Sequence, residues 1–120
     1  MELRVAVASE DGVEVQHFGH ATRFQVYDLH RSGIALVEAR DHAPSCAPGE
    51  ERAAGHQRAL ELIEDCRALI VARIGPNALR LVESRGIAVY ESEGPAAEAL
   101  KELAAAEERD PVPGGGDRAL

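Results

Sequence analysis

Two histidines lie three positions apart in the segment HFGHATRF, at His17 and His20, downstream of a short apolar run. Imidazole nitrogen suits iron, zinc and copper, and iron–sulfur clusters favour thiolate sulfur. Cys46 and His56 follow in a later loop and helix, so these four side chains form a candidate set of soft metal ligands. Their spacing matches no zinc finger and no HExxH pattern, so it indicates a class of chemistry rather than a defined motif.

The members of this set differ in how strongly they indicate a ligand. His17 is the best single candidate, because Phe18 would anchor its loop and Gly19 would let the chain turn. His20 fits a ligand and a solvated loop residue equally well. His56 lies on the apolar stripe of its helix, which favours a packed histidine over a ligand.

Three further side chains are expected to have no direct role. His42 lies beside a proline-rich loop and His30 lies in a hairpin turn, so both are expected to be exposed and idle. Cys66 lies where a helix meets an apolar run, and free cysteine is among the most buried residue types. We therefore place Cys66 in the core.

A second candidate binding element is the turn RIGPNA, in which Gly75, Pro76 and Asn77 open a helix after an apolar strand. The first N–H groups of a helix have no intrahelical partner and attract anions. Gly75 would also let a ligand approach the backbone closely. Most α/β proteins have such a turn, so it is a weak signal alone.

The sequence lacks the patterns of several enzyme classes. Ser9 follows a strand, but its surroundings are not G-x-S-x-G. The strand LRVAVA carries no carboxylate, as a two-metal nuclease would require. No P-loop and no G-x-G-x-x-G is present. We therefore expect a protein without catalytic activity.

The hydrophobic pattern predicts eight elements in the order strand, strand, strand, helix, strand, helix, strand, helix. Apolar alternation and β-branched runs indicate strands, and a 3.6-residue period indicates helices. The strands are expected at 3–8, 23–28, 34–40, 68–74 and 87–91, and the helices at 50–66, 77–85 and 94–109. Strand 68–74 should lie beside strand 3–8 after a right-handed crossover. The fold class is α/β, a three-layer domain with a mixed sheet and helices on both faces.

Composition limits the possible partners. The chain has 120 residues, 45% of them hydrophobic, and a net charge of −8. This charge argues against nucleic acid and against an anionic membrane surface. No run of 18 apolar residues and no signal peptide is evident, so we expect a cytoplasmic protein. Residues 1–107 are expected to form one domain and 108–120 a disordered tail.

The chain resembles the dinitrogenase iron–molybdenum cofactor biosynthesis family, which includes NifX-like and NafY-like proteins and the C-terminal domain of NifB. The resemblance rests on VAVASEDGVEVQHFGHATRFQVYD and on the segment from ALELIEDC through ARIGPNAL to GIAVYESEG. It covers roughly residues 3–105. It implies a ribonuclease H-like fold, with His17, Cys46 and the Gly75–Pro76 turn at the positions of the family motifs. The radical chemistry of NifB belongs to another domain and is not implied.

The resemblance implies a small carrier that binds an iron–sulfur or iron–molybdenum cluster precursor and passes it between donor and acceptor proteins. His17, with help from Cys46 and from either His20 or His56, would bind iron through two or three residues on mobile loops, and the amides at 75–77 would meet the anionic face of the cluster. Two alternatives remain open at this point. One is an interaction module that keeps the fold without the cluster, and the other is an enzyme acting on a small anion.

Overall fold

The computed structural model describes residues 2–31, 33–42 and 50–109. Its strands form a mixed sheet in the order β3-β2-β1-β4-β5. The β1–β2 and β2–β3 pairs are antiparallel, and the β1–β4 and β4–β5 pairs are parallel. The strand bounds are Glu2–Ala8 for β1, Arg23–His30 for β2, Gly33–Asp41 for β3, Ala68–Val71 for β4 and Ala88–Glu91 for β5.

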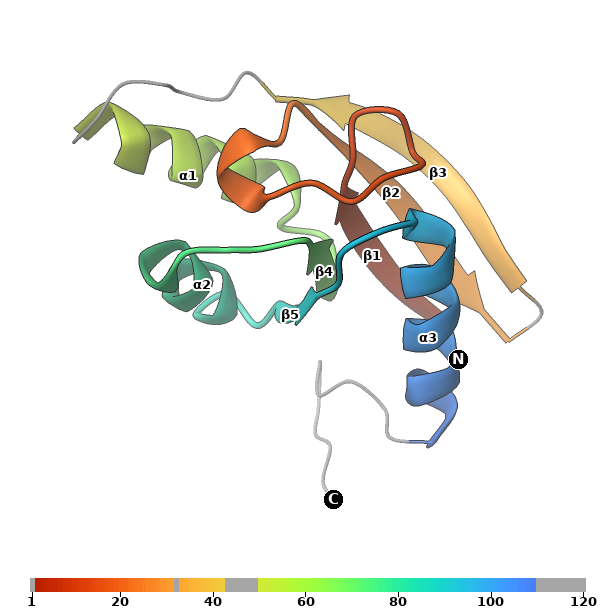
Figure 1. Ribbon diagram of the computed structural model, residues 1–120. Helices are drawn as coiled ribbons and strands as arrows, with labels where there is room; N and C mark the ends of the chain where they lie inside the picture. The colour runs from red at the N-terminus through yellow and green to blue at the C-terminus, as the bar shows by residue number, and fades with distance from the viewer. Residues whose placement is uncertain (1, 32, 43–49, 110–120) are drawn as a thin grey trace.

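Within the described residues, three α-helices and one 3-10 helix pack around this sheet. Helices α1 and α2 lie on one face, and α3 lies on the other (Figure 1). The helices are α1 at Glu50–Leu62, α2 at Pro76–Glu83 and α3 at Ala96–Arg109, and the 3-10 helix η1 is Phe18–His20. The expected three-layer α/β class with helices on both faces is therefore confirmed.

Strand alternation in β1 and β4 divides the core into two layers. On the first face, Ala6 and Ala8 of β1 pack in one cluster with residues of α1 and α2 such as Leu60 and Val82. On the second face, Val5 and Val7 pack with residues of α3. Successive side chains of a strand point to opposite faces, so a strand buried on both sides needs an unbroken apolar run. The runs in β1 and β4 meet that need.

The element order and the crossover agree with the expectation from sequence, since β4 pairs with β1. The largest boundary differences are at the C-terminal ends of α1 and β4. Helix α1 ends at Leu62, and the next residues form turns with i→i−3 hydrogen bonds, such as Cys66 N–H to Ile63 O at 2.9 Å. Strand β4 ends at Val71, because the next N–H, that of Ala72, donates to Gln16 O in the segment after β1.

Strand β3 is the least covered element. All of its residues except Arg40 are exposed, and Leu36 retains 60% of its surface. The alternating pattern of residues 34–40 predicted the strand correctly, but β3 lies at the sheet edge with little covering its faces. Within the described ranges, no helix is both long and apolar enough to cross a membrane.

Candidate functional site

The segment that leaves β1 is fixed against the carboxyl ends of β1 and β4. The N–H of Gln16 donates to Ala8 O at 2.7 Å, and Gln16 O accepts from Ala72 N–H at 2.8 Å. The N–H of Phe18 then donates to Arg73 O at 2.9 Å. His17 is therefore placed at the same sheet edge as the turn that opens α2, two residues beyond Arg73.

The same segment is also fixed to the start of α3. Val15 N–H donates to Gly94 O at 3.0 Å, and Ala96 N–H donates to Val13 O at 2.7 Å. Glu14 forms an isolated antiparallel bridge with Pro95. The mobile loop expected from the sequence is therefore a backbone-bonded segment that crosses the sheet edge.

His17 and His20 lie at the two ends of η1 and both side chains are exposed. Their ring centroids are 6.0 Å apart, with an interplanar angle of 59°. Two imidazoles that bind one ion through nitrogens at about 2.0–2.1 Å place their ring centres roughly 5–6 Å apart. The short 3-10 turn, which the sequence pattern did not predict, thus brings the two rings within range of a shared ligand.

Phe18 forms the base of this pair. Its side chain is 3% exposed and packs against Phe24, with ring centroids 6.1 Å apart. The ring of His56 on α1 lies 5.8 Å from the Phe18 ring. His56 is half-buried, as its place on the apolar stripe predicted. The predicted anchoring role of Phe18 is likewise consistent with its burial.

The expectation that His42 and His30 are exposed is wrong. Both are half-buried, and the ring of His42 lies 6.1 Å from that of Phe24. His42 follows β3, and its N–H donates to Thr22 O at 2.9 Å, which holds it beside the start of β2. Burial lowers the pKa of His42, and the nearby Arg58 and His56 lower it further. The position of His42 is set by the pairing register of the β2–β3 hairpin and not by its neighbours in the sequence.

The expected set of four ligands is only partly brought together. In the part of the chain that the structure describes, no three His, Cys, Asp or Glu side chains converge on a point that could hold one metal ion. Cys46 lies outside the described residues. Cys66 is 2% exposed in the core, as expected, and burial is the main reason that the pKa of its thiol is raised to about 12.

The turn that opens α2 has the expected form. Gly75 is the N-cap, with no side-chain capping bond, and Pro76 occupies the first turn, which contains no acidic residue. The Asn77 side chain accepts a hydrogen bond from Arg80. A Cβ at Gly75 would meet no atom within 4 Å, so packing does not require glycine there. The open space leaves the backbone of this turn accessible to a ligand.

One carboxylate beside this turn was missed by sequence reasoning. Glu91, at the end of β5, accepts a hydrogen bond from Ile74 N–H at 3.2 Å. Its negative charge lies next to the first turn of α2 and opposes an anion there. The parallel pairing of β4 and β5 brings it to this place, and no local motif in the sequence marks it.

A sequence profile of the family described as dinitrogenase iron-molybdenum cofactor matches residues 1–106. The chain is a member of the dinitrogenase iron-molybdenum cofactor family. The FeMo cofactor biosynthesis protein NifB of Klebsiella pneumoniae is 38% identical over a 90-residue alignment that covers 69% of this chain and 19% of that protein. The NifB of Chlorobaculum tepidum is 36% identical over a 99-residue alignment that covers 80% of this chain and 22% of that protein. The chain thus spans about a fifth of the length of these curated relatives.

Solved structures agree with the family fold. The crystal structure of PH0822 has a TM-score of 0.67 and 26% identity, and the match covers 86% of this chain and 89% of that one. The Methanocaldococcus jannaschii protein MJ0327 has a TM-score of 0.57 and 14% identity, with 86% and 88% covered, which supports the fold alone. The recognition of the family from the HFG and IGP segments is therefore confirmed.

Two buried polar atoms in this family member lie close in sequence to the histidine pair. Gln16 Oε1 and Thr22 Oγ1 are buried and have no hydrogen-bond partner among the described residues. A buried polar atom without a partner costs about 1–3 kcal/mol. Both residues flank the segment that carries His17 and His20, so the unmet hydrogen-bonding capacity is concentrated around the same segment. No sequence motif indicated either of them.

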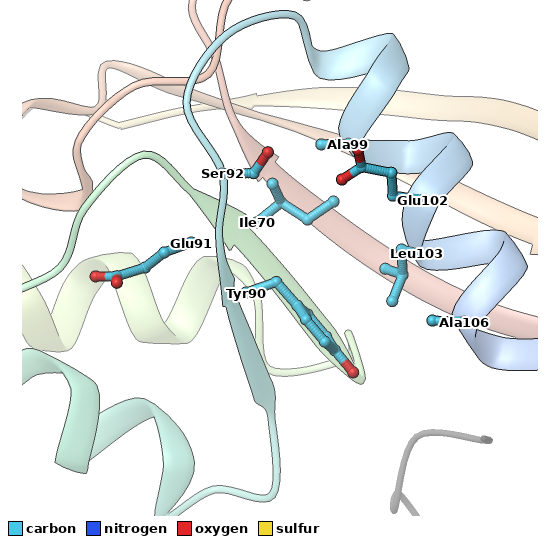
Figure 2. A pocket seen from close by; sticks show the side chains of 8 residues that line it. All are labelled: Ile70, Tyr90, Glu91, Ser92, Ala99, Glu102, Leu103 and Ala106. Atoms are coloured by element: carbon cyan, nitrogen blue, oxygen red, sulfur yellow. The ribbon is translucent and has the colours of Figure 1, made fainter.

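The family member also has a cavity of about 230 Å³ on the other face of the sheet. Figure 2 shows Ile70 and Tyr90 of β4 and β5 on one side of it and Leu103 of α3 on the other. Glu91 is also at its border, but its carboxylate points away from α3 (Figure 2). The described residues that line the cavity are mainly apolar and include no histidine or cysteine, so it does not share the chemistry of the histidine-bearing edge.

Proposed function

We propose that this domain carries a metal–sulfur cluster precursor during cofactor assembly, binding it through His17 and His20 and releasing it to an acceptor protein without catalysing a reaction. The family and the names of the curated relatives support a role in FeMo cofactor biosynthesis. The proposal transfers only a cargo-binding role to this chain, because the chain corresponds to a small part of those relatives.

The observation that carries the proposal is the exposed imidazole pair at the carboxyl edge of β1 and β4. The rings are 6.0 Å apart on a short 3-10 turn. Ligands of α/β proteins gather at the carboxyl ends of parallel strands. The donor type suits iron, so the residues present fit the proposed cargo.

The small number of ligands also suits release. A structural metal site surrounds its ion with four protein ligands, whereas an open site leaves positions for exchange. His17 and His20 offer two, and the resemblance adds Cys46, which lies outside the described residues. The backbone amides at residues 75–77, of which Gly75 and Asn77 carry an N–H, would contact the anionic sulfide face, and Gly19 and Gly75 leave room for that approach.

Anaerobic titration with a water-soluble synthetic [4Fe–4S] cluster bearing mercaptoethanol thiolates tests the proposal. We expect wild type to take up the cluster with a change in its visible absorption. His17→Ala should weaken uptake at least tenfold, because it removes one of the two imidazoles of the proposed site, and its melting temperature should stay close to that of wild type because His17 is exposed. Cys46→Ala, measured in parallel, tests the ligand implied by the resemblance.

The matched control is His30→Gln. His30 lies at the opposite end of β2 from the site and pairs with Glu2, so its loss should leave uptake unchanged. Equal uptake by wild type and His17→Ala would overturn the site. No uptake by folded wild type would favour the interaction module, and His17-dependent turnover of a small anion would favour an enzyme.

Three finer expectations belong to the same proposal. The ribonuclease H-like form of the α/β fold, the cytoplasmic location and the identity of donor and acceptor proteins stay predictions. A pull-down with and without the bound synthetic cluster would test whether an acceptor recognises the loaded state.

A further inference from the structure

The cavity on the α3 face lies at an edge of the sheet. Strand β5 is the last strand in the sheet order, and among the described residues it pairs only with β4. Tyr90 of β5 and Ile70 of β4 line one side of the cavity, and Leu103 and Ala106 of α3 line the other (Figure 2). An apolar cavity and an open strand edge therefore lie side by side.

The open edge of β5 presents the backbone groups of two residues. Ala88 N–H donates to Arg67 O at 3.0 Å, toward β4. Along a strand, the N–H and C=O groups of successive residues point alternately to the two neighbouring positions in the sheet. The backbone groups of Val89 and Glu91 therefore point away from β4. Such an edge is a template on which another chain can add a strand.

The size of the cavity suits one side chain better than a small-molecule ligand. Its volume is about 230 Å³, below the roughly 300–1,000 Å³ of typical ligand pockets. Its lining, with Ile70 and Leu103, favours an apolar group, because burial of apolar surface is the main favourable term in association. Every second side chain of a strand added to β5 would point to the α3 face, where the cavity lies. One of these side chains can enter the cavity as an anchor.

The charge beside the cavity is negative. Glu102 lines the cavity from α3 and is exposed, and its carboxylate lies toward the Ser92 end (Figure 2). Side chains two residues apart on a strand share a face and are about 7 Å apart. A basic side chain two positions from the anchor would therefore come close to this carboxylate. The net charge of −8 on the whole chain also favours a basic partner.

We propose that β5 and this cavity bind an extended basic segment of a partner protein. The segment adds a strand beside β5 and inserts one large apolar side chain between Tyr90 and Leu103. A lysine or arginine two residues away lies beside Glu102. Main-chain hydrogen bonds to the open edge of β5 supply affinity, and the cavity and the carboxylate supply sequence preference.

This interaction goes beyond the proposed cargo binding and does not depend on it. Phe18, which supports the histidine pair, belongs to the core cluster on the α1 face of the sheet. Ile70 and Leu103 belong to the core cluster on the α3 face. A partner can therefore hold the domain at β5 while the histidine-bearing edge stays accessible, and His17→Ala should leave partner binding unchanged.

The probe that tests the proposal is the peptide Thr-Lys-Thr-Leu-Thr-Lys-Thr, with a fluorophore at its N-terminus and an amidated C-terminus. Its symmetric order of side chains fits β5 in either strand direction. We expect saturable binding to wild type by fluorescence anisotropy. The same peptide with alanine in place of leucine should bind at least tenfold more weakly, because it lacks the anchor.

Two N-methylated forms of the peptide test the backbone hydrogen bonds. One carries the methyl group on the leucine nitrogen, and the other carries it on the nitrogen of the next residue. Because alternate N–H groups of an added strand face β5, one of the two forms should lose at least tenfold in affinity and the other should bind normally. Normal binding by both forms would overturn the added strand.

Substitutions on α3 test the cavity and the charge. Ala106→Phe fills the cavity and should weaken binding at least tenfold. Ala105→Phe is its matched control, because Ala105 is exposed and is not among the described residues that line the cavity. Glu102→Gln should weaken binding about threefold at low salt, whereas Glu98→Gln, at an exposed position outside the cavity lining, should not. Thermal unfolding shows whether each variant is folded.

Amide hydrogen exchange locates the added strand in wild type. Saturation with the leucine peptide should slow exchange at Val89 and Glu91, and unchanged exchange at both would overturn the proposal. Equal affinity for the leucine and alanine peptides, or no binding by folded wild type, would also overturn it. A dimer in solution that Ala106→Phe dissociates would assign the cavity to a second copy of the chain instead. Displacement of the peptide by an equal concentration of indole would assign it to a small molecule.

Discussion

Two regions on the α1 face of the sheet use their polar groups in opposite ways. At the carboxyl edge of β1, the imidazoles of His17 and His20 are exposed. Toward the other end of β1, Arg4 binds Asp28 at 2.8 Å and Asp65 at 3.1 Å. Arg40 of β3 also binds Asp65, at 2.7 Å, and donates to Leu62 O. One region therefore offers its polar side chains to solvent, and the other connects them to one another.

The difference indicates which region maintains the fold and which is available for a ligand. The Arg4–Asp65–Arg40 network joins β1, β3 and the turn after α1, so its groups already have partners. The histidine-bearing edge is held by backbone hydrogen bonds, such as Phe18 N–H to Arg73 O, so its imidazoles are not needed for that purpose. Substitutions in the two regions should therefore have separable effects on stability and on binding.

The largest expected effect comes from Phe18→Ala, because the Phe18 side chain both packs in the core and supports the histidine pair. It is 3% exposed in the core cluster and forms the base of the histidine pair. Truncation of a buried phenylalanine costs about 3–5 kcal/mol, and uptake of the synthetic cluster should also be lost. Urea unfolding and cluster titration measure the two effects.

Leu100→Ala is the matched control for Phe18→Ala. Leu100 is 4% exposed on α3, on the other face of the sheet. Its truncation should cost about 2–4 kcal/mol and leave uptake by the folded protein unchanged. If Leu100→Ala reduces uptake as much as Phe18→Ala does, the two faces are not separable.

Asp65→Asn should lower stability without changing cluster uptake. Its hydrogen bond with Arg40, and then that with Arg4, hold the pKa of Asp65 well below its ordinary range. A lowered carboxyl pKa contributes stability above the unfolded value of about 4, and that contribution is lost as the pH falls toward the folded value. Because Asp65 is 45% exposed, we expect a loss of only about 1 kcal/mol at neutral pH.

The pH profile distinguishes this network from a general loss of stability. Carboxyl groups titrate between about pH 5 and pH 2. Over this range the free energy of unfolding of wild type should fall by more than that of Asp65→Asn, because only wild type protonates the Asp65 carboxylate. Thermal unfolding at several pH values measures it, and cluster uptake at pH 7 should not change. Parallel acid profiles for the two proteins would show that the network does not stabilise the fold.

The sequence predicted the apolar runs, the helix periods and the element order, because these depend on local patterns. It did not predict the contacts that depend on register. His42 was expected to be idle, yet the hairpin of β2 and β3 brings it to Phe24. Glu91 reaches the start of α2 only because β5 pairs in parallel with β4. His17 could be named from sequence, but its distance from His20 depends on a 3-10 turn that has no apolar period.

Alanine substitution of a glycine with positive φ should lower stability, whereas substitution of the glycine beside the histidine pair should lower cluster uptake. Gly86 has a φ of 81°, where a side chain is strained, so Gly86→Ala should cost about 1 kcal/mol or more and leave uptake intact. A Cβ at Gly19 would meet no atom within 4 Å, so Gly19→Ala should raise the free energy of unfolding by at most about 0.5 kcal/mol and should not lower it. Its methyl group stands beside the histidine pair, so uptake should fall. Unchanged uptake by Gly19→Ala would mean that the cluster does not approach η1 closely.

The smallest effect concerns the charge beside α2. Glu91 accepts from Ile74 N–H at 3.2 Å and is exposed, so its charge repels an anion at the helix start only through a screened interaction. Glu91→Gln keeps an oxygen that can accept the same hydrogen bond. A single charge near a helix end contributes about 0.5 kcal/mol, so the dianionic synthetic cluster should bind about two- to threefold more tightly at low salt. The gain should vanish at high salt, whereas the effect of His17→Ala should persist because it removes a coordinate bond. If Glu91→Gln weakens binding, the helix start does not face the cluster, and the imidazoles alone would define where it lies.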